Sequence, residues 1–151
     1  MEQLCIIPSG KPKIWDKSPE IGAVKASEAY TGTFHRLCQQ YAKMHYSNWV
    51  ILSPKYGFLR PDDRIEKTYD LSFSNKNDPN VISITELKEQ VQSYRLHDVR
   101  EVVMLGGKKF KPIVEMLFGD PIKRTFPLHG LKGIGYMQQR LRDAIHNKEI
   151  L

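Results

Sequence analysis

Three short, unbroken apolar runs constrain the fold of this chain more than any other feature of its sequence. They span residues 4–7, 49–52 and 102–105. Runs of this length, without polar alternation, are typical of strands that are buried on both faces of a parallel sheet. A fourth run, residues 125–128, contains Pro127. Because proline cannot donate a backbone hydrogen bond, this run fits an edge strand or a strand end.

Apolar residues recur with helical spacing between and after these runs. The four sets span residues 34–42, 87–94, 110–117 and 137–145. Each set makes one apolar stripe, as a helix that packs on a sheet requires. Ser83 and Glu86 form a capping box that marks the start of the second helix. Alternating strands and helices predict a single α/β domain over residues 1–151, with three α/β/α layers and a mainly parallel sheet of roughly four strands.

The composition limits the class of protein further. Of the 151 residues, 40% are hydrophobic, which suffices for the core of one domain. No apolar run approaches the roughly 18 residues that span a bilayer, and the N-terminus lacks the pattern of a signal peptide. Cys5 and Cys38 have no metal-ligand spacing and fit buried thiols. We therefore expect a cytoplasmic protein without membrane contacts or a disulfide framework.

The charge balance indicates the kind of partner. The formal net charge is +6, which favours anionic partners, and nucleic acid is the commonest of these. Mild basicity is also usual among cytosolic proteins of this size, so the charge alone does not decide. The sequence leaves the oligomeric state open.

Two long irregular segments, residues 10–27 and 55–80, follow predicted strands directly. Long loops in compact domains are usually functional or mobile, and ligands of open α/β sheets bind at the carboxyl ends of the strands. After the first strand, Ser9, Gly10 and Lys11 combine a hydroxyl, a backbone that can approach closely and a cation, which suit an anion. An ordinary turn with solvated lysines is the alternative.

The second strand is followed by Ser53, Lys55, Tyr56 and Gly57. Tyr56 could stack on a base and Lys55 could pair with a phosphate. The alternative is a turn in which Tyr56 packs on the core. We predict that these residues bind the ligand together with those that follow the first strand.

The third and fourth predicted strands end in two further candidate segments. Gly106, Gly107 and Lys108 lead into a helix, whose N-terminus favours anions; the alternative is a plain strand-to-helix turn. His129 follows the fourth strand and could act as a general acid or base, or bond a neighbouring loop. The other histidines fall on or beside helices and are expected at the surface; they are His35, His45, His97 and His146.

Carboxylates that could activate water lie in or near the long loops. The candidates are Asp16, Glu28, Asp62, Asp63, Glu66 and Asp70. No paired spacing selects among them, and we take Asp16 and Asp62 as the catalytic candidates. The chain has no HExxH motif, Cys/His cluster or GxSxG motif, so we expect neither a metal nor another cofactor.

The segment of residues 52–62, LSPKYGFLRPD, continues through Ile65, Tyr69 and Leu71. This pattern resembles the peroxide-stress protein YaaA family and related small bacterial and phage proteins with a Ser-x-Lys-Tyr-Gly segment. Residues 8–11 and 29–32 fit the same group. The resemblance implies DNA binding in oxidative-stress protection, and related domains occur in enzymes that install modified bases in tRNA.

The strand order and residues 127–130 are also similar to the uracil-DNA-glycosylase fold. In that fold a final strand ends in a histidine that faces a flipped base, which implies a base contact for His129. The glycosylases place a water-activating aspartate directly after the first strand. Here Ser9, Gly10 and Lys11 stand there, and the nearest carboxylate is that of Asp16.

Three hypotheses about function follow. The first is a nucleotide- or nucleobase-recognising domain of nucleic-acid metabolism. The question whether it is an enzyme stays open; an enzyme of this kind would use metal-independent chemistry on a glycosidic bond or a base. The second is a non-catalytic DNA-binding stress protein like YaaA, with DNA favoured over RNA. The third is a protein that sequesters a nucleotide signal without catalysis.

Overall fold

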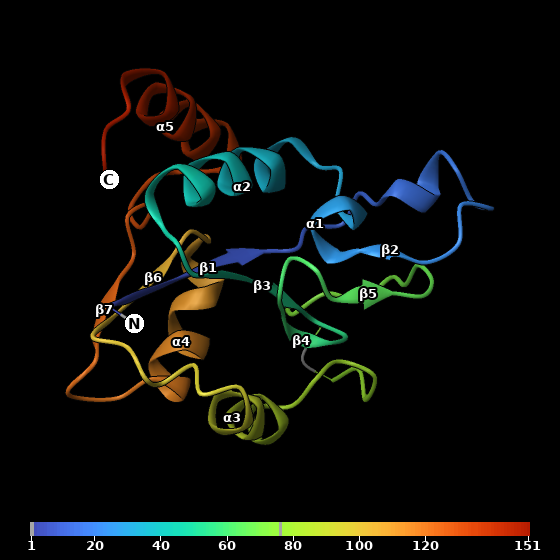
Figure 1. Cartoon of the computed structure of the whole chain (residues 1–151), viewed down its shortest axis with the longest axis horizontal. Helices are drawn as coiled ribbons and strands as arrows, with labels where there is room; N and C mark the ends of the chain where they lie inside the picture. Colours follow the sequence, from blue (N-terminus) through green and yellow to red (C-terminus); the bar gives the residue numbers. More distant parts are fainter. Residues whose placement is uncertain (1, 76) are drawn as a thin grey trace.

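The computed structural model describes residues 2–75 and 77–151 and has a mixed α/β fold (Figure 1). Its main sheet has five strands in the order β4-β3-β1-β6-β7. The four parallel strands are β1 (Gln3–Pro8), β3 (Trp49–Ser53), β6 (Glu101–Met104) and β7 (Lys123–Thr125). Strand β4 (Gly57–Leu59) is antiparallel to β3. A separate two-stranded sheet pairs β2 (Val24–Lys25) with β5 (Arg64–Ile65).

Helices cover both faces of the main sheet. Helices α2 (Thr33–His45) and α5 (Ile134–Asn147) lie on one face, and α3 (Ile84–Ser93) and α4 (Lys111–Leu117) lie on the other (Figure 1). A single turn, α1 (Ala26–Ala29), precedes α2, and two 3-10 turns span Ile14–Asp16 and Lys108–Phe110. The predicted α/β class with a mainly parallel sheet is confirmed.

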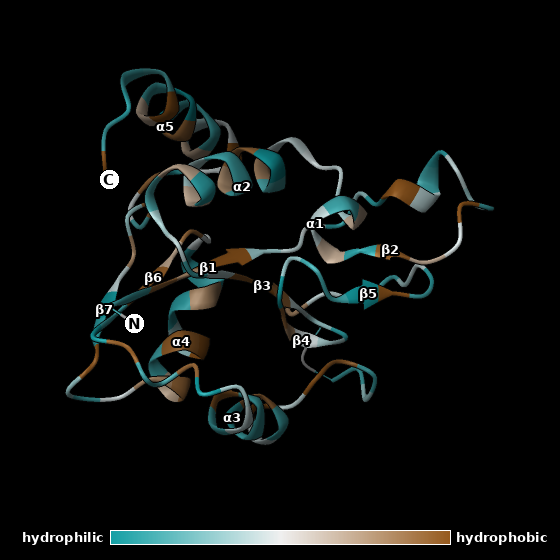
Figure 2. Ribbon diagram, viewed as in Figure 1, coloured by the Kyte–Doolittle hydropathy of each residue, from teal (hydrophilic) through white to brown (hydrophobic). Residues whose placement is uncertain are grey.

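The central strand shows why the apolar runs are unbroken. Cys5 and Ile7 pack into the core formed with α2 and α5, whereas Leu4 and Ile6 pack into the core formed with α3 and α4. Successive side chains of a strand point to opposite faces, so a strand covered on both sides must be apolar throughout. In Figure 2 the hydrophobic colours accordingly concentrate on the central strands and on the inner sides of the helices.

The predicted elements differ from the structure mainly at the edges of the sheet. The fourth parallel strand spans Lys123–Thr125, whereas the prediction was residues 125–128. The chain turns at Pro127, which lacks the N–H that a continuing strand would donate. Strand β4 was not predicted, because a three-residue strand after a turn has no period to detect. The predicted capping box is present, with the Glu86 N–H donating to Ser83 Oγ at 3.1 Å.

The connections of the sheet reverse direction between β1 and β6. From β1 the chain passes through α2, on one face of the sheet, to β3 on one side of β1. From β6 it passes through α4, on the opposite face, to β7 at the other edge of the sheet. Such a reversal between neighbouring parallel strands leaves a crevice at their carboxyl ends, where α/β proteins bind ligands. Within the described ranges, no helix is long and apolar enough to cross a membrane.

Candidate functional site

A cleft of about 970 Å³ opens at the carboxyl ends of β1, β3 and β6, where the connections reverse. Ser9, Gly10 and Lys11 enter it directly after β1. Gly107 and Lys108 enter it after β6. The cleft therefore brings together residues from two of the three strand ends that were predicted to carry the ligand-binding residues.

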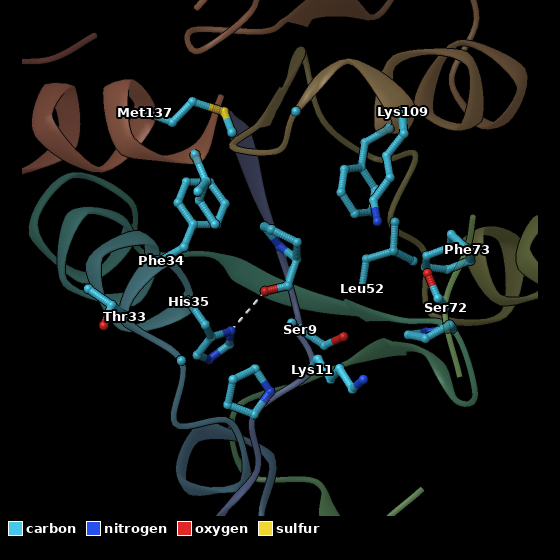
Figure 3. Close-up of a pocket in the computed structure, with 18 of the residues that line it drawn as sticks. Ser9, Lys11, Thr33, Phe34, His35, Leu52, Ser72, Phe73, Lys109 and Met137 are labelled. Atoms are coloured by element: carbon cyan, nitrogen blue, oxygen red, sulfur yellow. Dashed lines mark hydrogen bonds between the residues drawn. The ribbon is translucent and has the colours of Figure 1, made fainter. Parts of the chain in front are cut away.

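The walls of the cleft are apolar and include three phenylalanine side chains. Phe34 and Met137 line one side and Phe73 lines the other (Figure 3), and Phe110 also lines the cleft. The rings of Phe73 and Phe110 meet edge to face, with centroids 6.0 Å apart. Two aromatic walls of this kind suit a flat, partly apolar ligand, since a nucleobase gains about 1–3 kcal/mol by stacking on an aromatic side chain.

The rim of the cleft is cationic. Lys11, Lys108 and Lys109 are exposed and all line the cleft. Helices α2 and α5 both begin at the cleft with glycine N-caps, Gly32 and Gly133, and neither has a side-chain cap among the described residues. The N–H groups of an uncapped first turn attract anions, and the helix dipole adds to this attraction. An anionic group on the ligand is therefore favoured at this rim.

His35 lines the cleft and is only 2% exposed, so the prediction that it lies at the surface is wrong. It was placed there because it lies on a helix, but the side of α2 that carries His35 faces the sheet. Its Nδ1 donates to the carbonyl of Pro8 at 2.8 Å, drawn as a dashed line in Figure 3, and its Nε2 accepts from Gln39 Nε2 at 2.9 Å. Both ring nitrogens are therefore occupied within the protein.

Burial lowers the pKa of His35 from 6.5 to about 4, so the ring is neutral at neutral pH. Below pH 6.5 the unfolded chain binds a proton at this histidine that the folded chain does not bind. Stability that is present above pH 6.5 is therefore lost as the pH falls toward 4. Each pKa unit is worth about 1.4 kcal/mol, so we expect His35 to lower the free energy of unfolding by about 2 kcal/mol between pH 7 and about pH 5.

Urea unfolding at several pH values tests this expectation. The His35→Asn variant keeps an amide N–H near the Nδ1 position but cannot titrate. Its free energy of unfolding should depend less on pH than that of the wild type by about 2 kcal/mol over this interval. Equal pH dependence of the two proteins would show that His35 is not buried in its neutral form.

Besides His35 and its partners, a cluster of buried polar side chains lies beside the cleft and fixes the loops that surround it. Ser53 is fully buried; its Oγ accepts from the backbone N–H groups of Lys55 and Tyr56, each at 3.1 Å, and lies 2.7 Å from the hydroxyl of Tyr69. The Tyr69 hydroxyl also bonds that of Tyr30. Burial raises the pKa of both phenols, which therefore stay protonated. Ser53 acts here as the centre of a turn, with its hydroxyl used inside the protein.

Lys13 belongs to the same cluster. It is 3% exposed, and its Nζ donates to the carbonyl of Lys11 at 2.9 Å and lies 4.4 Å from the centroid of the Tyr69 ring. Burial lowers the pKa of this ammonium group, while the carboxylates of Asp16 and Asp70 act against the shift. Lys13 thus fixes the backbone that presents Lys11 to the cleft.

Ser53 does not line the cleft, and neither do four other residues that were predicted to bind the ligand. They are Lys55, Tyr56, Gly57 and Gly106. Tyr56 packs its ring edge to face on Tyr69 at 5.5 Å, and the Nζ of Lys55 lies 5.4 Å from the Tyr56 centroid. Gly106 is buried against the ring of Phe110. These residues support the neighbouring loops.

The three predicted catalytic residues also lie outside the cleft. His129 is exposed in the turn that follows β7. Asp16 is exposed, and its carboxylate accepts the backbone N–H of Lys13 at 2.9 Å. Asp62 has an 89% exposed side chain, 3.7 Å from Lys25 Nζ. The carboxylate that does line the cleft is that of Asp70. No cluster of three His, Cys, Asp or Glu residues within the described ranges is placed to hold a metal.

Comparison with known proteins identifies the family. Residues 17–143 match the family described as "Family of unknown function (DUF6884)". The chain belongs to this family. It is also similar to the "Uncharacterized protein YfjM" of Bacillus subtilis (strain 168), with 44% identity over 151 residues that cover 100% of both chains. The family match begins after the loop that carries Ser9 to Lys11, whereas the likeness to the Bacillus subtilis protein includes that loop. Neither description names an activity, and the cleft is the feature of the structure that bears on function.

Proposed function

We propose that this chain is a nucleotide- or nucleobase-recognising domain of nucleic-acid metabolism. One observation carries the proposal: at the reversal point of the sheet, a single cleft combines aromatic walls with a cationic rim. A nucleotide has the same division into a flat base and an anionic phosphate. Pockets of roughly 300–1,000 Å³ are of the size that holds such small ligands.

The lining residues supply a role for each part of a nucleotide. Phe34 and Phe73 contact the faces of the base from opposite sides. Lys108 and Lys109, the first two residues of the 3-10 turn after β6, pair with the phosphate. Ser9 lines the cleft and is 4% exposed, and its hydroxyl, which lies beside that of Tyr69, can bond a polar edge of the base. Burial makes such a bond selective, because an unmatched polar group there is costly.

The cleft favours recognition over chemistry. His35 is held neutral with both ring nitrogens bonded inside the protein, so it is not free to move a proton. Asp70 supplies the carboxylate of the cleft and is the residue that would activate water in an enzymatic version of this proposal. The internal bonding of both His35 ring nitrogens also supports the second candidate, a protein that sequesters a nucleotide without transforming it.

The likeness to the uracil-DNA-glycosylase topology stays part of the proposal. Across the sheet, the parallel strands run in the order second, first, third, fourth of the chain. This order supports the topology that the resemblance implied. The relation to the YaaA family is likewise a proposal, supported by the segment that contains Ser53, Lys55 and Tyr56.

A thermal-shift experiment tests the proposal directly. Ligands that bind only the folded protein raise its melting temperature, and at equal ligand concentration the tighter ligand gives the larger rise. We expect nucleoside monophosphates to raise it more than nucleosides, because the rim binds phosphate, and more than ribose 5-phosphate, because the walls bind the base. If ribose 5-phosphate or inorganic phosphate gives the same shift as every nucleotide, base recognition is excluded.

A further inference from the structure

A second hollow, of about 410 Å³, lies between α2 and α5 on the outside of the sheet layer. Its lining includes Arg36 and Lys43 of α2 and Arg142 of α5. The remaining lining residues are uncharged, so the hollow presents positive charge alone. We name this feature the α2–α5 groove.

The cations of the α2–α5 groove have no acidic partners in the part of the chain that the structure describes. None of Arg36, Lys43 and Arg142 forms an ion pair there. By contrast, the neighbouring Arg140 of α5 is paired with Glu149 at 2.7 Å. Three unpaired cations around one hollow repel one another, and an anion placed between them relieves this repulsion.

The α2–α5 groove and the cleft meet at the start of α2. Thr33, at the first turn of α2, lines both. From Thr33 the cations follow α2 outward to Lys43, and with about 1.5 Å of rise per helical residue this track is about 15 Å long. A row of that length matches the repeated phosphates of a strand, whereas one terminal phosphate would meet only the cation nearest to the cleft.

We propose that the ligand of the cleft is a nucleotide within a nucleic-acid strand, and that the α2–α5 groove binds the phosphates that flank it. This inference rests on the proposed function, because it places one base in the cleft. The net charge of +6 supports a polyanionic partner. The groove has few apolar side chains, with Leu37 among mainly polar neighbours, so its contacts are to the strand backbone and do not select its sequence.

Binding of a mononucleotide and of a short single-stranded oligonucleotide, each measured at several salt concentrations, tests this inference. The wild type should bind the oligonucleotide more tightly. In the double variant Arg36→Gln and Arg142→Gln, the slope of log affinity against log salt should fall in magnitude by about 1.4, since each phosphate contact to a single strand contributes about 0.7. With the affinities of the two proteins taken as equal at about 1 M salt, this change in slope corresponds to about 25-fold weaker oligonucleotide binding at about 0.1 M salt. Mononucleotide binding should be unchanged.

The matched control removes two cations from the other side of the sheet. Lys88 and Arg95 lie on α3 and just after it, and both are exposed. The double variant Lys88→Gln and Arg95→Gln has the same net charge as the groove variant and should bind the oligonucleotide like the wild type. Equal losses of oligonucleotide affinity in the two double variants would mean that only net charge matters, and would overturn the proposal that the groove binds the phosphates.

The remaining outcomes separate this inference from the function on which it rests. If the wild type binds the mononucleotide but binds the oligonucleotide no more tightly, the strand is excluded and the proposed function stands. If it binds neither, both fail. If an oligoglutamate peptide displaces the oligonucleotide and depends equally on Arg36 and Arg142, the groove takes an acidic protein partner instead.

Discussion

A Gly107→Phe variant is expected to fold normally and to bind nucleotides at least about a hundredfold more weakly, a loss of about 2.8 kcal/mol. Gly107 lies at the edge of the cleft with φ of −71° and ψ of −179°, a conformation that any residue adopts. A Cβ atom there would lie 3.7 Å from Met137 Cε, an ordinary contact. The backbone therefore tolerates the substitution, and the added ring extends into the space that the ligand would occupy.

The control for this variant is Gly119→Phe. Gly119 is exposed after α4, and a Cβ atom there would meet nothing within 4 Å. Titration calorimetry of the two variants, with circular dichroism to show that both are folded, separates a blocked cleft from a general effect of an added phenylalanine. Full nucleotide affinity in a folded Gly107→Phe protein would move the binding site away from the cleft.

Replacing Gly57 with alanine should lower the free energy of unfolding by about 3 kcal/mol. Gly57 has a φ of +73°, which costs a residue with a Cβ about 1–2 kcal/mol. The added Cβ would also overlap with Gln90 Oε1, and the resulting overpacking costs about 1–3 kcal/mol. Gln90 cannot move freely, because it accepts from the N–H of Phe58 and donates to the carbonyl of Tyr56, each at 2.8 Å.

Gly22→Ala is the matched control for the conformational cost alone. Gly22 has a φ of +81°, and a Cβ atom there would meet nothing within 4 Å. Its substitution should therefore cost only about 1–2 kcal/mol. Urea unfolding of both variants measures the difference, which is the cost of displacing Gln90. Equal losses at the two positions would show that the Gln90 contacts do not hold this turn.

The fold could be predicted where burial leaves a pattern in the sequence. The runs that contain Ile6, Ile51 and Val103 are apolar because helices cover both faces of the strands, and this pattern is visible without any tertiary information. Short edge strands leave no such pattern. Strand β4 needs β3 as its partner, and β7 ends before Pro127, so both depend on neighbours that the local sequence does not reveal.

Part of the candidate site could be predicted for a similar reason. Ser9 and Gly107 follow buried strands directly, and parallel strands place such residues at one edge. Phe73 and Asp70 reach the cleft from a long loop, whose path depends on the hydrogen bonds of Tyr69. His35 is buried because its side of α2 faces the sheet, and its helical position alone did not indicate this.

The central claim is that a nucleotide binds in the cleft between the ends of β1 and β6. Titration of the isotope-labelled protein with a nucleoside monophosphate, followed by the chemical shifts of the backbone amides in NMR spectra, tests it most directly. The largest changes should occur at Gly10, at the first turn of α2 and at Gly107 and Lys108, with little change along α3. Changes confined to α3 or to other surfaces away from the cleft, or none at saturating nucleotide, would contradict it.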